Sequence, residues 1–169
     1  MTDFTIRRFE SSDTERIREL HEEAMRVEGA YDENIPDTDL ERVEEEYLSD
    51  GEFLVGLFGG KIVAMGAIRS VSESMAELHE TKATPVAELK RMRVDPDHQR
   101  RGYGQRIYDA LESTAREQGY RELVLDTSPT LDGAQRLYEG NGFQRERHVE
   151  LDAFDGSIEL LLYRKPLSD

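Results

Sequence analysis

Hydrophobic and polar positions along the chain alternate between a strand period and a helix period. Residues 4–9 alternate apolar and polar side chains, which predicts a strand. Apolar residues then recur at helical spacing, first at Ile17, Leu20, Ala24 and Val27 and later at Leu40, Val43 and Tyr47. Ser12 with Glu15, and Thr38 with Glu41, have the spacing of a capping box, which predicts the start of each of these two helices.

Turn residues divide the next part of the chain. Gly59-Gly60 separates two apolar segments, residues 53–58 and 61–68, and predicts a tight hairpin between them. Residues 71–85 are polar, so we expect a loop or ragged strand ends there. Residues 86–94 predict a strand that ends at Asp95-Pro96.

The remaining residues alternate helix and strand. Glycines at 102 and 104 open a predicted helix over residues 103–118, for which Gly119 supplies the cap. We then expect a strand at 123–125, a helix at 132–139, and a second hairpin of residues 143–151 and 157–163 around Asp155-Gly156.

The order of these elements predicts an α/β protein with a mixed sheet and helices on its faces. Strand–helix–strand units favour parallel pairing in the middle of the sheet, whereas the hairpins favour antiparallel pairing at both ends. No repeat, low-complexity tract or linker-like change in composition interrupts the 169 residues, so we expect a single domain over residues 1–169.

The charge narrows the range of partners. Aspartate and glutamate total 37 against 22 lysine and arginine, which gives a formal net charge of −15. Acid excess with few lysines resembles proteins of salt-loving cytoplasms, where salt screens self-repulsion; the alternative is an ordinary acidic enzyme. A diffuse polyanion is a poor nucleic-acid binder, because contacts to phosphates supply most of the non-specific affinity. We therefore expect no nucleic-acid partner.

Several other classes of site are excluded or disfavoured. Cysteine is absent, and the four histidines show no metal-ligand spacing, so we expect no metal site. There is no apolar run of about 18 residues, and the first ten residues lack the apolar stretch of a signal peptide. We therefore expect a cytoplasmic protein without a membrane partner.

The most specific segment is VDPDHQRRGYG, from Val94 to Gly104. A strand end, a loop and a glycine-rich helix start combine unpaired backbone N–H groups with the positive end of a helix dipole, which favours an anion. Arg100 and Arg101 add cationic charge to this turn. The phosphate-loop motif is absent, and Ile107 breaks the dinucleotide glycine pattern. An ordinary glycine-rich turn is the alternative interpretation.

Two blocks of the sequence resemble the GNAT superfamily of N-acetyltransferases. The family hallmark is [Gln/Arg]-x-x-Gly-x-[Gly/Ala], entered from a strand that ends in Val-x-Pro; the matching residues are Val94, Pro96, Gln99, Gly102 and Gly104. The downstream block is a strand followed by a short helix with a tyrosine before a Gly-Phe pair, here LVLDT and then AQRLYEGNGF. The resemblance covers about residues 86–145.

The resemblance implies a fold and a cofactor. The expected fold is a mixed sheet of about seven strands, splayed in the middle, with about four helices on its faces. The expected cofactor is acetyl-CoA, with its diphosphate on the backbone amides of Arg100, Arg101, Gly102, Tyr103, Gly104 and Gln105. Gln99, the first residue of the hallmark, is also a candidate for cofactor binding. Its pantetheine arm is expected along the backbones of Met92, Arg93 and Val94. Thr127 stands where family members commonly carry asparagine, and it is a further candidate for a cofactor contact.

The resemblance also implies catalytic residues. Tyr138 matches the tyrosine that faces the sulfur and acts as general acid, and the alternative is a packing role. Glu88 is the candidate base; strict alternation would put it on one sheet face with Lys90, Met92 and Val94. A glutamate in solvent or paired with Lys90 or Arg91 is the alternative. Asp126 and His148 are weaker candidates, and water chains serve as the base in some family members.

The expected reaction is acetyl transfer to a primary amine of a small molecule or peptide. Tyr31, Asp32 and Glu33, between the first two helices, are candidates for the acceptor side. The resemblance allows a homodimer in which the C-terminal hairpin completes a neighbour's site. A non-catalytic acyl-CoA sensor, or a nucleotide-phosphate binder of another family, are the alternative functions. The sequence does not identify the acceptor.

Overall fold

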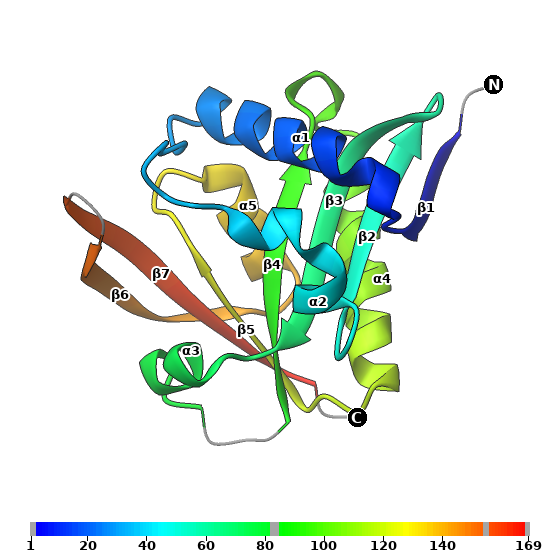
Figure 1. Cartoon of the computed structure of the whole chain (residues 1–169). Coiled ribbons are helices and arrows are strands. Elements are labelled where there is room, and N and C mark those ends of the chain that lie inside the picture. Colours follow the sequence, from blue (N-terminus) through cyan, green and yellow to red (C-terminus); the bar gives the residue numbers. More distant parts are fainter. Residues whose placement is uncertain (1–2, 82–84, 154–155, 168–169) are drawn as a thin grey trace.

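The fold is a seven-stranded mixed sheet covered by helices on both faces (Figure 1). The structure is a computed structural model, and it describes residues 3–81, 85–153 and 156–167. In the order β1-β2-β3-β4-β5-β7-β6, the strands are β1 (Phe4–Arg8), β2 (Glu52–Phe58), β3 (Lys61–Ser70), β4 (Val86–Val94), β5 (Glu122–Thr127), β7 (Gly156–Pro166) and β6 (Gln144–Ala153). The predicted fold class is confirmed.

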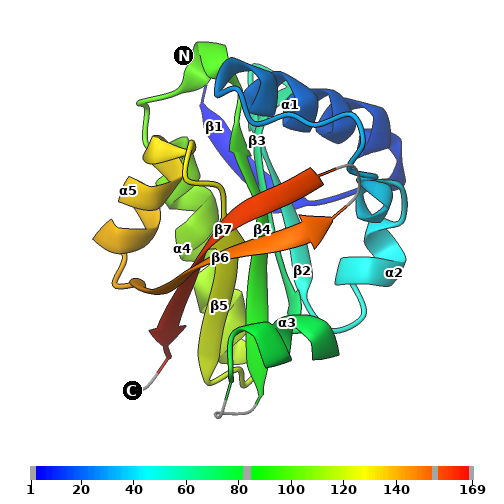
Figure 2. The ribbon, with the colours of Figure 1, turned by 90° about the vertical axis from the view of Figure 1, so that its left-hand side faces the viewer.

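Five α-helices occur in the described part of the chain: α1 (Thr14–Val27), α2 (Val43–Tyr47), α3 (Glu73–Leu78), α4 (Tyr103–Glu117) and α5 (Asp132–Gly140). Helices α1 and α2 cover one face of the sheet, and α4 and α5 lie on the other (Figure 2). Within residues 3–81, 85–153 and 156–167, none of the helices has the length and apolarity that a membrane crossing requires.

Each face of the sheet has its own hydrophobic core. On the α4 face, Ile107, Tyr108 and Leu111 of the helix are almost fully buried in one cluster with Leu89 of β4 and Leu123 of β5. On the α1 face, a second cluster joins the buried stripe of α1 and residues of α2 to β2 and β3. The predicted apolar stripes thus pack against opposite faces, which fixes α1 and α4 on either side of β4.

The centre of the sheet opens between β4 and β5. The two strands pair in parallel only over three positions, from Val86 with Glu122 to Glu88 with Val124. Strand β4 continues to Val94, while β5 leaves it and pairs with β7 (Figure 1). The expected splay is confirmed, and beyond Glu88 no strand within the described residues pairs with the edge of β4 that faces β5.

A bulge at Arg91 changes which side chains share a face of β4. The register with β3 shifts between Met65 and Ala67, and Arg91 has a φ of +60°. Met92 therefore packs on the α4 face with Leu89, whereas alternation predicts the face of Glu88. The prediction that Glu88, Lys90, Met92 and Val94 point to one face is wrong, because the extra residue reverses the parity after position 91.

The structure also differs from the sequence predictions at the starts of two helices and in one predicted loop. Neither predicted capping box forms: Asp13 Oδ2 accepts from Glu10 N at 2.8 Å, and residues 38–41 form a 3₁₀ turn without a side-chain cap. Residues 71–85 contain the short helix α3, which Ser72 caps, although this helix buries none of its residues and so gives no apolar stripe. Residues 82–84 of that predicted loop, and Asp155 of the predicted turn, lie outside the described residues.

Candidate active site

A cavity of about 630 Å³ lies beside the part of β4 that continues beyond its pairing with β5. It is lined by residues of α1, of the turn before α4, and of α5. It brings together most of the predicted site: Met92, Arg93, Val94, Gln99, Arg100, Gly102, Tyr103, Gly104, Gln105 and Tyr138. Residues separated by more than 40 positions thus line one space. Arg136 also lines it and was missed by the sequence analysis, although its place two residues before Tyr138 on the same short helix was a usable signal.

The turn before α4 presents unpaired backbone N–H groups. Gly102 caps the helix with a φ of +81°, a left-handed conformation that favours glycine. The first intrahelical bond runs from Arg106 N to Gly102 O at 3.1 Å. The amides of Tyr103, Gly104 and Gln105 therefore precede the hydrogen-bonded part of the helix, at the positive end of its dipole.

Gly104 leaves this turn bare on the cavity side. A Cβ added at Gly104 would lie 3.5 Å from Val94 Cγ2 and 3.8 Å from Leu137 Cδ2, which are ordinary contacts. Packing within the described residues therefore does not require glycine at this position. A ligand that approaches the backbone closely does require it, and the donors beside it suit an anion. The turn thus fits the diphosphate of the cofactor that the sequence resemblance implies.

A pair of side-chain amides ties the turn to α5. Gln105 Nε2 donates to Asn141 Oδ1 at 2.7 Å, and Asn141 Nδ2 donates to Gln105 Oε1 at 2.9 Å. Asn141 Nδ2 also donates to Leu137 O at 2.7 Å, at the end of α5. These bonds set the start of α4 relative to the helix that carries Tyr138. The Gln105 side chain therefore has a structural role, while its main chain lines the cavity.

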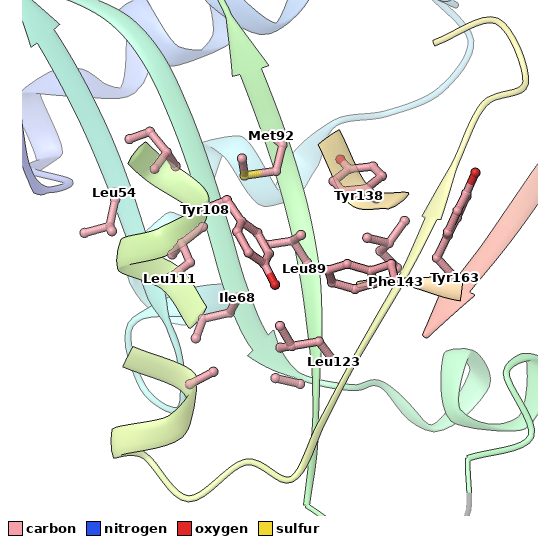
Figure 3. Close-up of a cluster of buried hydrophobic side chains, with 14 of the residues drawn as sticks. Leu54, Ile68, Leu89, Met92, Tyr108, Leu111, Leu123, Tyr138, Phe143 and Tyr163 are labelled. Atoms are coloured by element: carbon pink, nitrogen blue, oxygen red, sulfur yellow. The ribbon is translucent and has the colours of Figure 1, made fainter. Parts of the chain in front are cut away.

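Tyr138 lies at the inner end of the cavity, at the same edge of the α4-side core as Met92 (Figure 3). Its ring packs between Phe143 and Tyr163, with centroids 5.8 and 6.1 Å away. Burial raises the pKa of the Tyr138 hydroxyl to about 12, although the charge of Arg93 opposes the rise. The hydroxyl thus keeps its proton at neutral pH.

The hydroxyl of Tyr138 differs from those of four of the other five buried tyrosines; Tyr103 is the exception, because its hydroxyl too hydrogen-bonds to none of the described residues. Four tyrosines donate their hydroxyl to a described residue: Tyr47, Tyr108, Tyr120 and Tyr163. Tyr138 has no such partner within the described ranges, yet only 5% of its surface is exposed. A protonated and unpartnered phenol at the wall of a cavity can donate a proton to a ligand there.

Arg93 places a cation beside this phenol. Its Nε donates to His21 Nδ1 at 3.1 Å, and its Nη1 donates to Met92 O at 2.7 Å. Burial lowers the pKa of the guanidinium to about 10, so it stays charged at neutral pH. His21 was not identified from the sequence, because a histidine on the buried stripe of α1 has no distinguishing pattern. Burial, with the charges of Arg93 and Arg91, lowers the pKa of His21, so the ring is neutral.

Three predicted site residues do not line the cavity. Glu88 is fully buried beside Lys90, whose Nζ lies 3.3 Å from its Oε1, as the alternative interpretation anticipated. Arg101 is exposed, with its guanidinium 5.7 Å from the centroid of the Phe58 ring. Thr127 is buried at the end of β5, opposite Leu161 of β7.

The weaker candidates are also distributed around the molecule. The charge of Asp126 raises the pKa of Tyr138, which places this carboxylate near the phenol. His148 is exposed on β6, with Nε2 3.6 Å from Glu159 Oε1. Tyr31 meets His21 edge to face, at a centroid distance of 6.5 Å.

Comparisons with known proteins identify the family of this chain. The sequence pattern described as the Acetyltransferase (GNAT) family matches residues 14–143. That is most of the chain, and the chain belongs to the GNAT family of acetyltransferases. Among curated proteins it is 30% identical over 109 residues to N-acetyltransferase 8F1 of Rattus norvegicus, covering 64% of this chain and 47% of that one.

Other relatives extend the picture. N-acetylaspartate synthetase of Xenopus tropicalis is 29% identical over 129 residues, which cover 75% of this chain and 44% of that one. The chain thus spans about half the length of the curated relatives it matches.

Solved structures share the fold. A GNAT acetyltransferase from Staphylococcus aureus Mu50 superimposes with a TM-score of 0.80 at 21% identity, covering 98% of this chain and all of that one. The protein yncA of Salmonella typhimurium, solved with its cofactor acetyl-CoA, gives a TM-score of 0.76 at 20% identity, covering 99% and 95%.

Proposed function

We propose that the protein is an N-acetyltransferase that moves the acetyl group of acetyl-CoA to a primary amine of a small molecule or peptide. The observation that carries the proposal is one cavity that joins the unpaired amides of residues 103–105 to the unpartnered hydroxyl of Tyr138. Family membership supports acetyl transfer, and the name of one relative, N-acetylaspartate synthetase, favours a small-molecule acceptor.

The chain's own groups suit the two ends of acetyl-CoA, which when bound supplies a thioester carbonyl as the electrophile. The amides of Tyr103, Gly104 and Gln105 would bind the diphosphate, with Arg100 adding charge at the rim. The main chain of β4 at Met92–Val94 would bind the amides of the pantetheine arm, because that edge of the strand has lost its β5 partner.

Acetyl transfer replaces the carbon–sulfur bond of the thioester with a carbon–nitrogen bond, and two proton transfers accompany this change. Tyr138 holds a proton on Oη and donates it to the sulfur as the carbon–sulfur bond breaks and the carbon–nitrogen bond forms. Glu88 is proposed to take the amine proton. Neither of its carboxylate oxygens has a hydrogen-bond partner within the described residues, and both are buried. Because Glu88 does not line the cavity, the proton reaches it through water.

The test separates binding from turnover. Calorimetry should detect acetyl-CoA binding to the folded protein, and release of free CoA thiol should follow when a panel of primary amines is added. Binding of acetyl-CoA without turnover of any amine would favour the acyl-CoA sensor. Preferential binding of ATP or NAD over acetyl-CoA would favour the nucleotide-phosphate binder and overturn the proposal.

We also propose that the protein operates in a salt-rich cytoplasm. The net charge of −15 supports this, as does the acidic start of α2, where Glu44 and Glu45 are both exposed. Salt at molar concentration reduces the Debye length to about 3 Å, which removes most of the repulsion between such exposed charges.

A further inference from the structure

The inside of the cavity contains a cation without an anionic partner. Arg93 lines the cavity beside Tyr138, and the two groups are close enough for each to shift the pKa of the other. Its two hydrogen bonds go to neutral acceptors, the ring of His21 and the backbone oxygen of Met92. Among the residues that the structure describes, no carboxylate lies within 4.0 Å of the guanidinium, and Nη2 makes no hydrogen bond.

Two carboxylates from the segment before α2, Asp37 and Asp39, lie near this arginine but have closer partners. Asp39 receives two hydrogen bonds from Arg91, from Nε at 2.9 Å and from Nη2 at 2.6 Å. Asp37 lies 3.1 Å from the same guanidinium and 3.3 Å from His21 Nε2. These acids therefore pair directly with Arg91 and orient His21. The charges of Asp37 and Asp126 act on Arg93 only from beyond 4.0 Å, so within the described residues no direct ion pair holds its guanidinium.

His21 holds Arg93 in one orientation without neutralising it. Its Nδ1 accepts from Arg93 Nε, so a neutral ring carries its proton on Nε2, which lies 3.3 Å from both Asp37 Oδ2 and Arg91 Nη1. The histidine is 4% exposed and cannot swing away without leaving its packed position on α1. The guanidinium is thus positioned in advance, with a free terminal nitrogen, in a space that must admit the acceptor.

A half-buried arginine that lines a cavity with a free nitrogen can bind an anion, and carboxylates suit its planar donors best. We propose that the acceptor is an α-amino acid, or a molecule with an α-amino acid terminus, whose carboxylate binds the Arg93 guanidinium. This inference rests on the proposed acetyl transfer and specifies its substrate class. In such a molecule the amine is two bonds from the carboxylate carbon, so binding at Arg93 keeps the nucleophile near Tyr138.

The charges of the cavity disfavour a purely cationic acceptor. Arg93 would repel a diamine or polyamine that enters as far as Tyr138. Glu28 and Asp132 also line the cavity, but both are exposed, and solvent screens their attraction for an ammonium group. An α-amino acid carries no net charge from its backbone groups and brings the anion that Arg93 lacks.

The experiment compares acids with their amides. The probes are the twenty L-amino acids and the corresponding L-amino-acid amides, each tested for thiol release with acetyl-CoA. At least one acid should exceed its own amide in kcat/KM by about 10- to 100-fold, the range expected of a charge-assisted hydrogen bond.

Variants of Arg93 test whether this residue causes the preference for acids over amides. Arg93→Gln should raise KM for the acid and bring the ratio of kcat/KM for acid and amide close to one. The two probes are compared within the same variant, so any general change in rate that follows from losing the charge beside Tyr138 cancels in the ratio. Arg93→Lys should retain part of the preference. Arg18→Gln makes the same change of charge on an exposed residue of α1, and it should change nothing. Calorimetry with the N-acetylated acid and its N-acetylated amide gives a readout that needs no turnover.

The outcomes separate this inference from the acetyl transfer on which it rests. Amides that equal or exceed their acids in every pair would overturn the inference and leave the acetyltransferase intact. Loss of acetyl-CoA affinity in Arg93→Gln would assign the arginine to the cofactor, which also overturns it. Acetyl-CoA binding without transfer to any of the forty probes would count against both.

Discussion

Two arginines on one strand have opposite environments. Arg91 donates to Asp39 with two nitrogens and also lies 3.1 Å from Asp37, so two carboxylates surround it. Arg93, two residues further along β4, has a neutral histidine and a backbone oxygen. One cation is part of a closed network that holds the segment before α2 against the sheet. The other faces a cavity.

The difference separates structural from functional polar groups. In the Arg91 network, Asp39 accepts from both Arg91 and the Tyr47 hydroxyl, and Arg69 covers the Tyr47 ring at 5.2 Å. In the cavity, the helix amides, the Tyr138 hydroxyl and Arg93 Nη2 are open. Polar atoms that face a cavity and hydrogen-bond to none of the described residues are available to a ligand that binds there. Changes in the network should therefore affect stability, and changes in the cavity should affect binding and turnover.

The largest effect should come from closing the turn before α4. Gly102→Asp should lower acetyl-CoA affinity more than 100-fold, because a carboxylate would occupy the place of the diphosphate. Gly119→Asp is the matched control: its φ of +87° and open surroundings resemble the +81° and open surroundings of Gly102. Both variants should lose similar stability. Calorimetry that finds equal acetyl-CoA affinity in the two would contradict the binding site.

The second largest effect should come from removing the hydroxyl of Tyr138. Tyr138→Phe should lower kcat about 100-fold with little change in acetyl-CoA affinity, because it removes a general acid and keeps the ring. Since the pKa of Tyr138 is about 12, loss of its proton should not reduce the wild-type rate below about pH 10. Tyr163→Phe removes a hydroxyl that binds Glu139 and should leave kcat nearly unchanged. An equal loss in both variants would assign Tyr138 to packing.

On the closed side, Asp39→Asn should lower stability and leave acetyl-CoA affinity unchanged. Burial would raise the pKa of Asp39, but the hydrogen bonds and charge of Arg91 lower it to about 2 from 3.8. The native carboxylate thus contributes about 2 kcal/mol that is complete above about pH 4 and is lost as the pH falls toward 2. Urea unfolding from pH 2 to 7 should show a weaker pH dependence in the variant. Glu41→Gln, at an exposed ion pair with Arg18, is the control.

A smaller effect tests the predicted base. Glu88→Gln should lower kcat/KM about tenfold near neutral pH and flatten the acid limb of its pH profile, because an amide cannot accept the amine proton. The profile is measured by thiol release with a saturating acetyl-CoA concentration. An acid limb that keeps the wild-type shape would leave the proton to Asp126 or to a water chain.

The smallest expected effect is that of salt concentration on thermal stability. Raising KCl from 0.1 to 2 M should raise the midpoint of thermal unfolding, because it screens a net charge of −15. The rise should be similar in wild type and Asp39→Asn, since the Arg91 network is largely buried and poorly screened. A midpoint that falls with salt would contradict the proposed salt-rich setting.

The sequence by itself predicted most of the helices and strands and the glycine-rich turn before α4. Hydrophobic periodicity, the Gly59-Gly60 turn and the glycines before α4 are local signals, and each depends on residues only a few positions apart. Tyr138 was identified through the resemblance to the GNAT family, in which a tyrosine precedes the Gly-Phe pair. Local physics therefore predicted most helices and strands and the turn before α4, and the resemblance supplied Tyr138.

Only the tertiary structure decided which other residues lie at the cavity and which do not. The bulge at Arg91 moved Met92 to the α4 face, and no residue type marks such an inserted position in advance. Glu88 proved to lie away from the cavity, and His21 proved to hold Arg93, because both depend on which strands separate and which helix covers them. Contacts between residues far apart in the chain come from packing, and periodicity along a single chain does not record them.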